Sequence, residues 1–137
     1  MTRTPSRWAL AGLVAAGGTA GTATRWAVAR LADGTAGTWP WPTFGVNVVG
    51  SFALGALLAL LGRGRDEGWR RAVRLGAGTG VLGGFTTYST FAVETDTLVR
   101  DGHLLLGGAC AVVSVVAGVG AAALGTLVAG RRRGGEA

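Results

Sequence analysis

Four long apolar runs, separated by short polar stretches, organise this 137-residue chain. The runs cover residues 8–31, 43–61, 72–99 and 104–129. A helix of about 20 mostly apolar residues is long enough to cross the hydrocarbon core of a bilayer. The pattern therefore predicts an all-α integral membrane protein with four transmembrane helices in a single domain, 1–137.

A polar stretch interrupts the third apolar run at Gly83–Phe91. It contains two glycines, four hydroxyl side chains of Thr and Ser, one Tyr and two Phe, and no charge. Non-helical backbone at membrane depth is tolerated only where it is buried in protein or lines a wet cavity. We therefore expect the third helix to be broken here, and we expect the functional site at the break.

Most of the charged residues lie between the apolar runs and at the chain ends. All 13 basic residues are arginines, and the net charge is +6. Four spans place both termini and the loop between spans two and three on one side; ten arginines lie there and three lie opposite. The positive-inside rule then predicts cytoplasmic termini. A basic start also fits a signal peptide, but the first apolar run continues past signal length.

Several classes of site lack the residues that they need. The single cysteine, Cys110, excludes an intrachain disulfide and a zinc site. The sequence offers no catalytic constellation and no metal-ligand cluster, so we do not expect an enzyme. Glu94 and Asp96 follow the break and are expected near the interface. A proton-coupled exporter would therefore lack its usual carboxylate at mid-depth.

The polar residues inside the spans each allow two interpretations. Arg25 either extends to the interface or has a functional role, as an anion-attracting charge at a pore mouth or as a salt-bridge partner. Asn47 either bonds a neighbouring helix or offers its N–H groups to an anion. Ser114 is most simply a backbone-bonded helix serine. Neutral donors suit a path that must both admit and release an ion, so a small-anion path and a structural membrane protein remain open.

Three stretches, in this order, resemble the Fluc/CrcB family of fluoride channels. Gly17–Trp26 resembles the family's glycine-rich first helix, which ends in Arg and an aromatic residue. Thr43–Phe52 resembles its second-helix signature, with an Asn followed by Gly-Ser-Phe, and Gly83–Phe91 resembles its helix break. Three motifs in the same order and spacing make the resemblance specific.

The resemblance implies an antiparallel, dual-topology dimer of four-helix subunits that lets fluoride leave the cytoplasm passively. Arg25 would be a vestibule or structural residue. The backbone carbonyls of Gly83 and Thr86 would hold a structural sodium ion at the dimer centre. The fluoride path would be lined by Asn47, Thr87, Tyr88, Ser89, Thr90, Phe91 and Ser114.

Two residues differ from the family pattern. Tyr88 replaces the usual Phe, and Cys110 replaces the Tyr of a Tyr-x-x-x-Ser pair. These differences, with the arginine bias, leave open whether the partner is a second copy or an oppositely oriented homologue. The alternatives are a non-conducting or partner-dependent structural subunit and a small coupled transporter. In each case we expect the chain in the plasma membrane of a bacterium, with no nucleic-acid partner.

Overall fold

The computed structural model describes residues 6–31 and 38–131, and all regular secondary structure in these residues is helical. Arg3, Arg132 and Arg133, which entered the count of arginines by side, lie outside the described residues, as does the loop segment 32–37. The elements are α1 (Arg7–Leu31), α2 (Trp41–Leu61), α3 (Gly68–Val73), the π-helix η1 (Arg74–Leu82), α4 (Gly83–Phe85), α5 (Tyr88–Arg100) and α6 (Leu104–Arg131).

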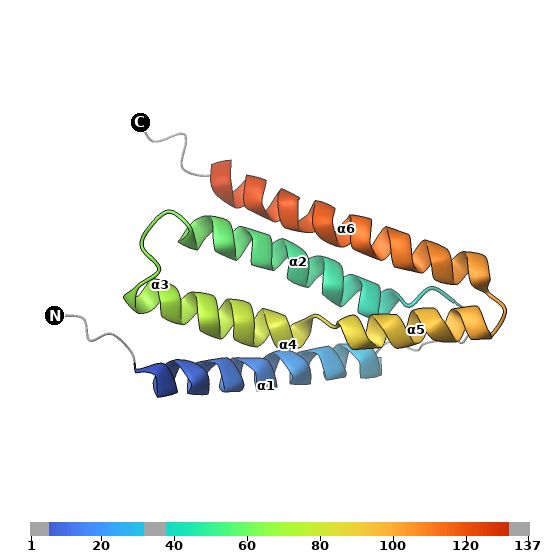
Figure 1. Cartoon of the computed structure of the whole chain (residues 1–137), viewed down its shortest axis with the longest axis horizontal. Helices are drawn as coiled ribbons and strands as arrows, with labels where there is room; N and C mark the ends of the chain where they lie inside the picture. Colours follow the sequence, from blue (N-terminus) through green and yellow to red (C-terminus); the bar gives the residue numbers. More distant parts are fainter. Residues whose placement is uncertain (1–5, 32–37, 132–137) are drawn as a thin grey trace.

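These elements form four roughly aligned rods (Figure 1). The segments α3, η1 and α4 follow one another without a gap and form one rod together with α5. α1 packs against η1 and α4, α2 packs against α6, and α5 also packs against α6. The start of α1 lies at the same end of the bundle as the ends of α2 and α6 (Figure 1).

Glycines bring α1 and the η1–α4 rod into backbone contact. A Cβ at Gly21 would overlap the carbonyl oxygen of Val81, and a Cβ at Gly84 would overlap that of Gly18. Gly17 likewise faces the backbone of η1. Small residues at four-residue spacing, such as Gly17 and Gly21, allow this close approach of two helices. This contact fixes where α4 ends relative to α1, and so positions the break.

The turn between α5 and α6 also has a clear local cause. Gly102 has φ 85°, a left-handed conformation that glycine adopts without steric cost. Its N–H donates to the Val99 carbonyl at 3.1 Å, and the N–H of His103 donates to the Leu98 carbonyl at 2.8 Å. This pair of bonds is a Schellman motif, which ends α5 and lets α6 return along the bundle.

Within the described residues, α2 and α6 are long and apolar enough to cross a membrane. Protein buries only 22% of the apolar window in α2 and 11% of that in α6, whereas a core helix of a soluble protein would be mostly buried. Their exposed Val and Leu side chains therefore fit contact with lipid. The other two predicted spans, 8–31 and 72–99, stay predictions. α1 mixes apolar residues with Gly, Thr and Arg, and the segment from η1 to α5 is divided at the break.

Candidate functional site

The rod of η1, α4 and α5 is interrupted at two residues. Thr86 has φ −77° and ψ 155°, and Thr87 has φ −146° and ψ 122°, so both are extended rather than helical. Helical structure resumes at Tyr88. The interruption falls within the polar stretch Gly83–Phe91, near the middle of the rod (Figure 1).

Asn47 of α2 holds the extended backbone of the break. Its Oδ1 accepts the N–H of Thr87 at 2.8 Å, and its Nδ2 donates to the Thr87 carbonyl at 3.0 Å. The amide thus replaces the backbone partners that Thr87 loses when the helix stops. Of the two interpretations of Asn47, the interhelical bond is observed. One N–H of Nδ2 remains for another acceptor.

Thr87 begins the next helix with its own side chain. Its Oγ1 accepts the backbone N–H of Thr90 at 3.1 Å, which is the N-cap interaction of α5. The same hydroxyl donates to Thr90 Oγ1 at 3.0 Å and lies 3.3 Å from Ser89 Oγ. Thr87 is buried and Ser89 is exposed. The three hydroxyl groups therefore form a connected network, with Thr87 as its buried centre.

The interruption also redirects the carbonyl group of Gly84. In a continuous α-helix this oxygen would accept the N–H four residues later. Here it accepts from Arg25 Nε at 3.2 Å and lies 3.5 Å from Thr22 Oγ1, both on α1. Arg25 thus donates to a carbonyl at the end of α4, and its role as a vestibule or structural residue stays a prediction.

Two further carbonyls lose their helical partners. The N–H of Thr87, which would bond to the Gly83 carbonyl in a continuous helix, donates to Asn47 instead. The N–H of Thr90, which would bond to the Thr86 carbonyl, donates to the Thr87 side chain. The break thus releases two backbone oxygens close together in the chain, and backbone oxygens are ligands that hard cations accept.

A groove of about 700 Å³ runs along the break, between α2, the η1–α5 rod and α6. Tyr88 and Phe91 both line it, with ring centroids 6.0 Å apart and planes tilted by 48°. Ser114 lines it from α6, and its one charged lining residue, Arg74, is paired with Asp66. The groove brings together seven of the residues singled out from the sequence: Asn47, Gly83, Thr86, Thr87, Tyr88, Phe91 and Ser114.

The remaining sequence-based candidates lie elsewhere. Arg25 and Thr90 line a small cavity of about 30 Å³ on the α1 side of the break, together with Thr43 and Thr87. Ser89 lines neither this cavity nor the groove. Buried Thr87 is the residue that the two spaces share, so its hydroxyl network separates them.

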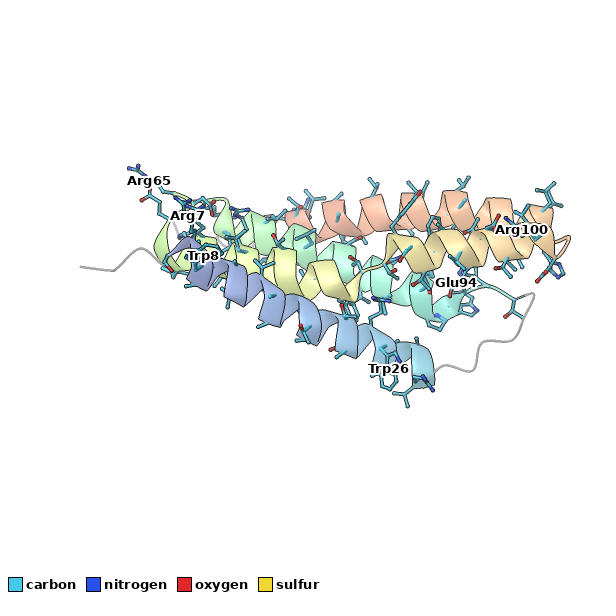
Figure 2. All side chains as sticks on the ribbon, turned by 60° about the horizontal axis from the view of Figure 1, so that its bottom comes forward. Arg7, Trp8, Trp26, Arg65, Glu94 and Arg100 are labelled. Atoms are coloured by element: carbon cyan, nitrogen blue, oxygen red, sulfur yellow. The ribbon has the colours of Figure 1, made fainter. Side chains whose placement is uncertain are left out.

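One carboxylate near the break escaped the sequence reasoning. Thr43 donates its hydroxyl to Glu94 Oε1 at 2.9 Å, while Glu94 Oε2 is buried without a hydrogen-bond partner. The sequence placed Glu94 past the break; the structure sets it against the first turn of α2 (Figure 2). No local pattern in the sequence indicates this contact, because Thr43 and Glu94 are 51 residues apart.

Cys110 is fully buried between α5 and α6. Its sulfur lies 3.9 Å from Thr95 Oγ1 and 4.0 Å from Ser114 Oγ, and the thiol is free. Cys110, which stands where the family has the Tyr of a Tyr-x-x-x-Ser pair, therefore lies next to Ser114 on one face of α6. Across the described residues, no group of three His, Cys, Asp or Glu side chains could hold a metal ion.

The chain matches the family model described as CrcB-like protein, Camphor Resistance (CrcB), over residues 12–126. It is 49% identical over 110 residues to "Fluoride-specific ion channel FluC 1" of Cutibacterium acnes, covering 80% of this chain and 77% of that protein. It is 48% identical over 125 residues to "Fluoride-specific ion channel FluC 2" of Leifsonia xyli subsp. xyli, covering 88% and 86%. The corresponding protein of Novosphingobium aromaticivorans is 47% identical over 109 residues, covering 77% and 84%. The chain therefore belongs to the CrcB-like family of membrane proteins.

Proposed function

We propose that this protein is a fluoride-specific channel that lets fluoride leave the cytoplasm passively. The observation that carries the proposal is the break held by Asn47, which sets Thr87, Tyr88 and Phe91 along one groove. Relatives that share about half of its residues are named as fluoride-specific ion channels, not as enzymes. We accordingly assign transport rather than catalysis.

The groove offers an anion neutral contacts. The free N–H of Asn47 and the hydroxyl of Ser114 can donate to a small anion, and the edges of Tyr88 and Phe91 carry the positive rim of the ring quadrupole. Such donors replace water around the ion without the full charge that would trap it. The further path residues Thr87, Ser89 and Thr90 act through the hydroxyl network at the start of α5.

The groove is open on one side, and we propose that an antiparallel dimer closes it. Tyr88 is 82% exposed in the single chain although it lies at the centre of the polar break. An inverted second subunit would cover this ring and complete two paths at the interface. The apolar groove walls from α2 and α6 suit such a contact.

We propose a structural sodium ion at the centre of this dimer. The fit rests on the carbonyls of Gly83 and Thr86, which lose their helical partners at the break. Both residues line the groove, which a second subunit would cover in the proposed dimer. Two subunits would supply four backbone oxygens, the donor type that a hard cation prefers. A bound sodium ion would add positive charge near the anion paths.

The proposed orientation places both termini in the cytoplasm of a bacterium, with the chain in the plasma membrane. The arginine bias supports this orientation. A sequence that inserts in both directions needs little bias, so we propose an oppositely oriented homologue as the partner rather than a second copy. Conducting antiparallel dimers formed by the purified chain alone would contradict this choice of partner.

The test of the channel proposal is fluoride efflux from liposomes that contain the purified protein, with chloride as the control anion. Fast fluoride-selective efflux is the expected result, either from the chain alone or after co-reconstitution with a homologue of opposite charge bias. Rescue by the homologue would favour the partner-dependent subunit over a self-sufficient dimer. No efflux under either condition would contradict the channel proposal.

Glu94 gives the coupled-transporter alternative a specific residue. Its buried Oε2 has no partner and lies within a predicted span, where a proton carrier would be expected. Coupling predicts that an imposed pH gradient drives fluoride uphill and that Glu94→Gln abolishes this movement. A channel predicts flux that follows only the electrochemical gradient of fluoride.

A further inference from the structure

The two ends of the bundle differ in charge. Described residues at the end where α1 begins include two carboxylates, Asp66 and Glu67, against seven arginines: Arg7, Arg63, Arg65, Arg70, Arg71, Arg74 and Arg131. The opposite end balances three arginines with three carboxylates: Arg25, Arg30, Arg100, Glu94, Asp96 and Asp101. Figure 2 shows Arg7 and Arg65 at the first end and Arg100 at the other. The excess positive charge is therefore local.

Four of the seven arginines are occupied within the protein. Arg74 makes two bonds to Asp66, at 2.9 and 2.6 Å, and this contact holds the pKa of the Asp66 carboxyl below its ordinary value. Arg65 pairs with Glu67 at 3.1 Å. Arg63 donates to the carbonyl of Gly130 near the C-terminus of α6. Arg70 donates to the carbonyl of Leu61 at the C-terminus of α2. Both carboxylates are thus already paired.

The other three, Arg7, Arg71 and Arg131, are exposed and make no hydrogen bond or ion pair with the described part of the chain. Two of them, Arg7 and Arg71, lie at about the same height along the bundle axis. α1 and the η1 rod run in the same direction, with Leu13 against Gly76. Six residues back along each helix, this register puts Arg7 and Trp8 of α1 at about the same height along the bundle as Arg70 and Arg71 of α3.

Two exposed indoles accompany these arginines. Trp8 is 82% exposed and Trp69 is 65% exposed, and the guanidinium of Arg70 lies 5.0 Å from the Trp69 ring centroid. Tryptophans gather at membrane–water interfaces, where the ring sits at headgroup level. Guanidinium groups that make no hydrogen bond within the protein match phosphate oxygens in geometry and charge. We name the four residues Arg7, Trp8, Trp69 and Arg71 the basic corner.

We propose that the basic corner binds the headgroup of an anionic phospholipid, with the guanidinium groups on the phosphate and the indoles at the glycerol level. The two pairs of residues come from different helices, so a bound lipid would join α1 to α3 on the outside of the bundle. The proposal depends on membrane insertion and not on fluoride conduction, so the two can fail separately.

The test is a lipid titration of the purified full-length chain in detergent, read as its thermal midpoint. Phosphatidylglycerol should raise the midpoint saturably, and phosphatidylcholine with the same acyl chains should not. Each arginine near an anionic surface contributes roughly fivefold to affinity, so Arg7→Gln/Arg71→Gln should need about 25-fold more phosphatidylglycerol. The matched control, Arg30→Gln/Arg100→Gln, removes two arginines from the other end and should titrate like the unaltered protein.

Each remaining outcome contradicts the proposal. If phosphatidylglycerol raises the thermal midpoint of the Arg7→Gln/Arg71→Gln variant at the same concentrations as that of the unaltered protein, the basic corner is not the binding site. Stabilisation by inorganic phosphate to the same extent would identify a site for free phosphate rather than for lipid. If the double variant does not fold, quenching of tryptophan fluorescence by brominated lipids still decides. Brominated phosphatidylglycerol should quench the unaltered protein more than brominated phosphatidylcholine does, and equal quenching would overturn the proposal.

Discussion

The side-chain amide of Asn47 forms a two-bond pair with the backbone of Thr87, accepting its N–H at 2.8 Å and donating to its carbonyl at 3.0 Å. This pair joins α2 to the point where the third rod stops being helical. The extended backbone of Thr87 therefore has the partners that a helix would otherwise supply. The groove beside it depends on this contact for its shape.

Asn47→Ala should destabilise the protein and abolish fluoride flux, because both backbone groups of Thr87 lose their partner. An unsatisfied buried polar group costs about 1–3 kcal/mol. The thermal midpoint in detergent and liposome efflux measure the two effects. Ser51→Ala is the matched control, since Ser51 lines the same groove. An unchanged midpoint in Asn47→Ala would show that the pair does not hold the break.

Thr87→Val should shorten or fray the start of α5, while Thr87→Ser should preserve it. Valine keeps the shape of threonine but cannot accept the N–H of Thr90, and loss of an N-cap costs roughly 0.5–2 kcal/mol. Amide hydrogen exchange at Ser89 and Thr90 measures this local opening. Equal exchange in the valine and serine variants would contradict a capping role for the hydroxyl.

Sequence patterns predicted the helices and the location of the break, because apolar runs and a cluster of hydroxyls leave a direct trace in the chain. The glycine contact between α1 and η1 also has a pattern in the sequence, because Gly17 and Gly21 are four residues apart. The bond between Thr43 and Glu94 could not be predicted from the sequence. It joins residues 51 positions apart, which meet only after α2 and α5 pack in the folded bundle. The π-helical winding of η1 likewise has no sequence signature that we could use.

Phe91→Ile should abolish fluoride flux with little effect on folding. Isoleucine fills most of the same volume, but it lacks the positive ring edge that would face an anion in the groove. Reconstituted protein at equal density allows a direct comparison of efflux rates. The control is Val115→Leu on the facing wall of the groove, which changes an apolar residue without removing a ring. Normal efflux from Phe91→Ile would refute the role of the ring edge.

Tyr88→Phe should leave fluoride flux intact or raise it. The substitution keeps the ring and its edge and removes only the hydroxyl of an 82% exposed residue. If the edge is the anion contact, the hydroxyl is dispensable. The fluoride-to-chloride flux ratio should be measured with the rate, because a lost O–H donor can change selectivity. A complete loss of flux would mean that the hydroxyl itself holds the ion.

Gly21→Ala should separate α1 from the third rod and disturb the break from a distance. A Cβ at Gly21 would overlap the carbonyl oxygen of Val81 and lie 2.8 Å from the backbone nitrogen of Phe85, so the helices would have to move apart. Forced overpacking of this kind costs typically 1–3 kcal/mol. Gly12→Ala is a control on the same helix, because a Cβ there meets nothing within 4 Å.

Since Arg25 reaches the Gly84 carbonyl one helical turn further along α1, the displacement should also weaken the cap on α4. Gly21→Ala should therefore lower both the thermal midpoint and fluoride flux, whereas Gly12→Ala should lower neither; equal behaviour of the two variants would show that close approach of α1 does not position the break.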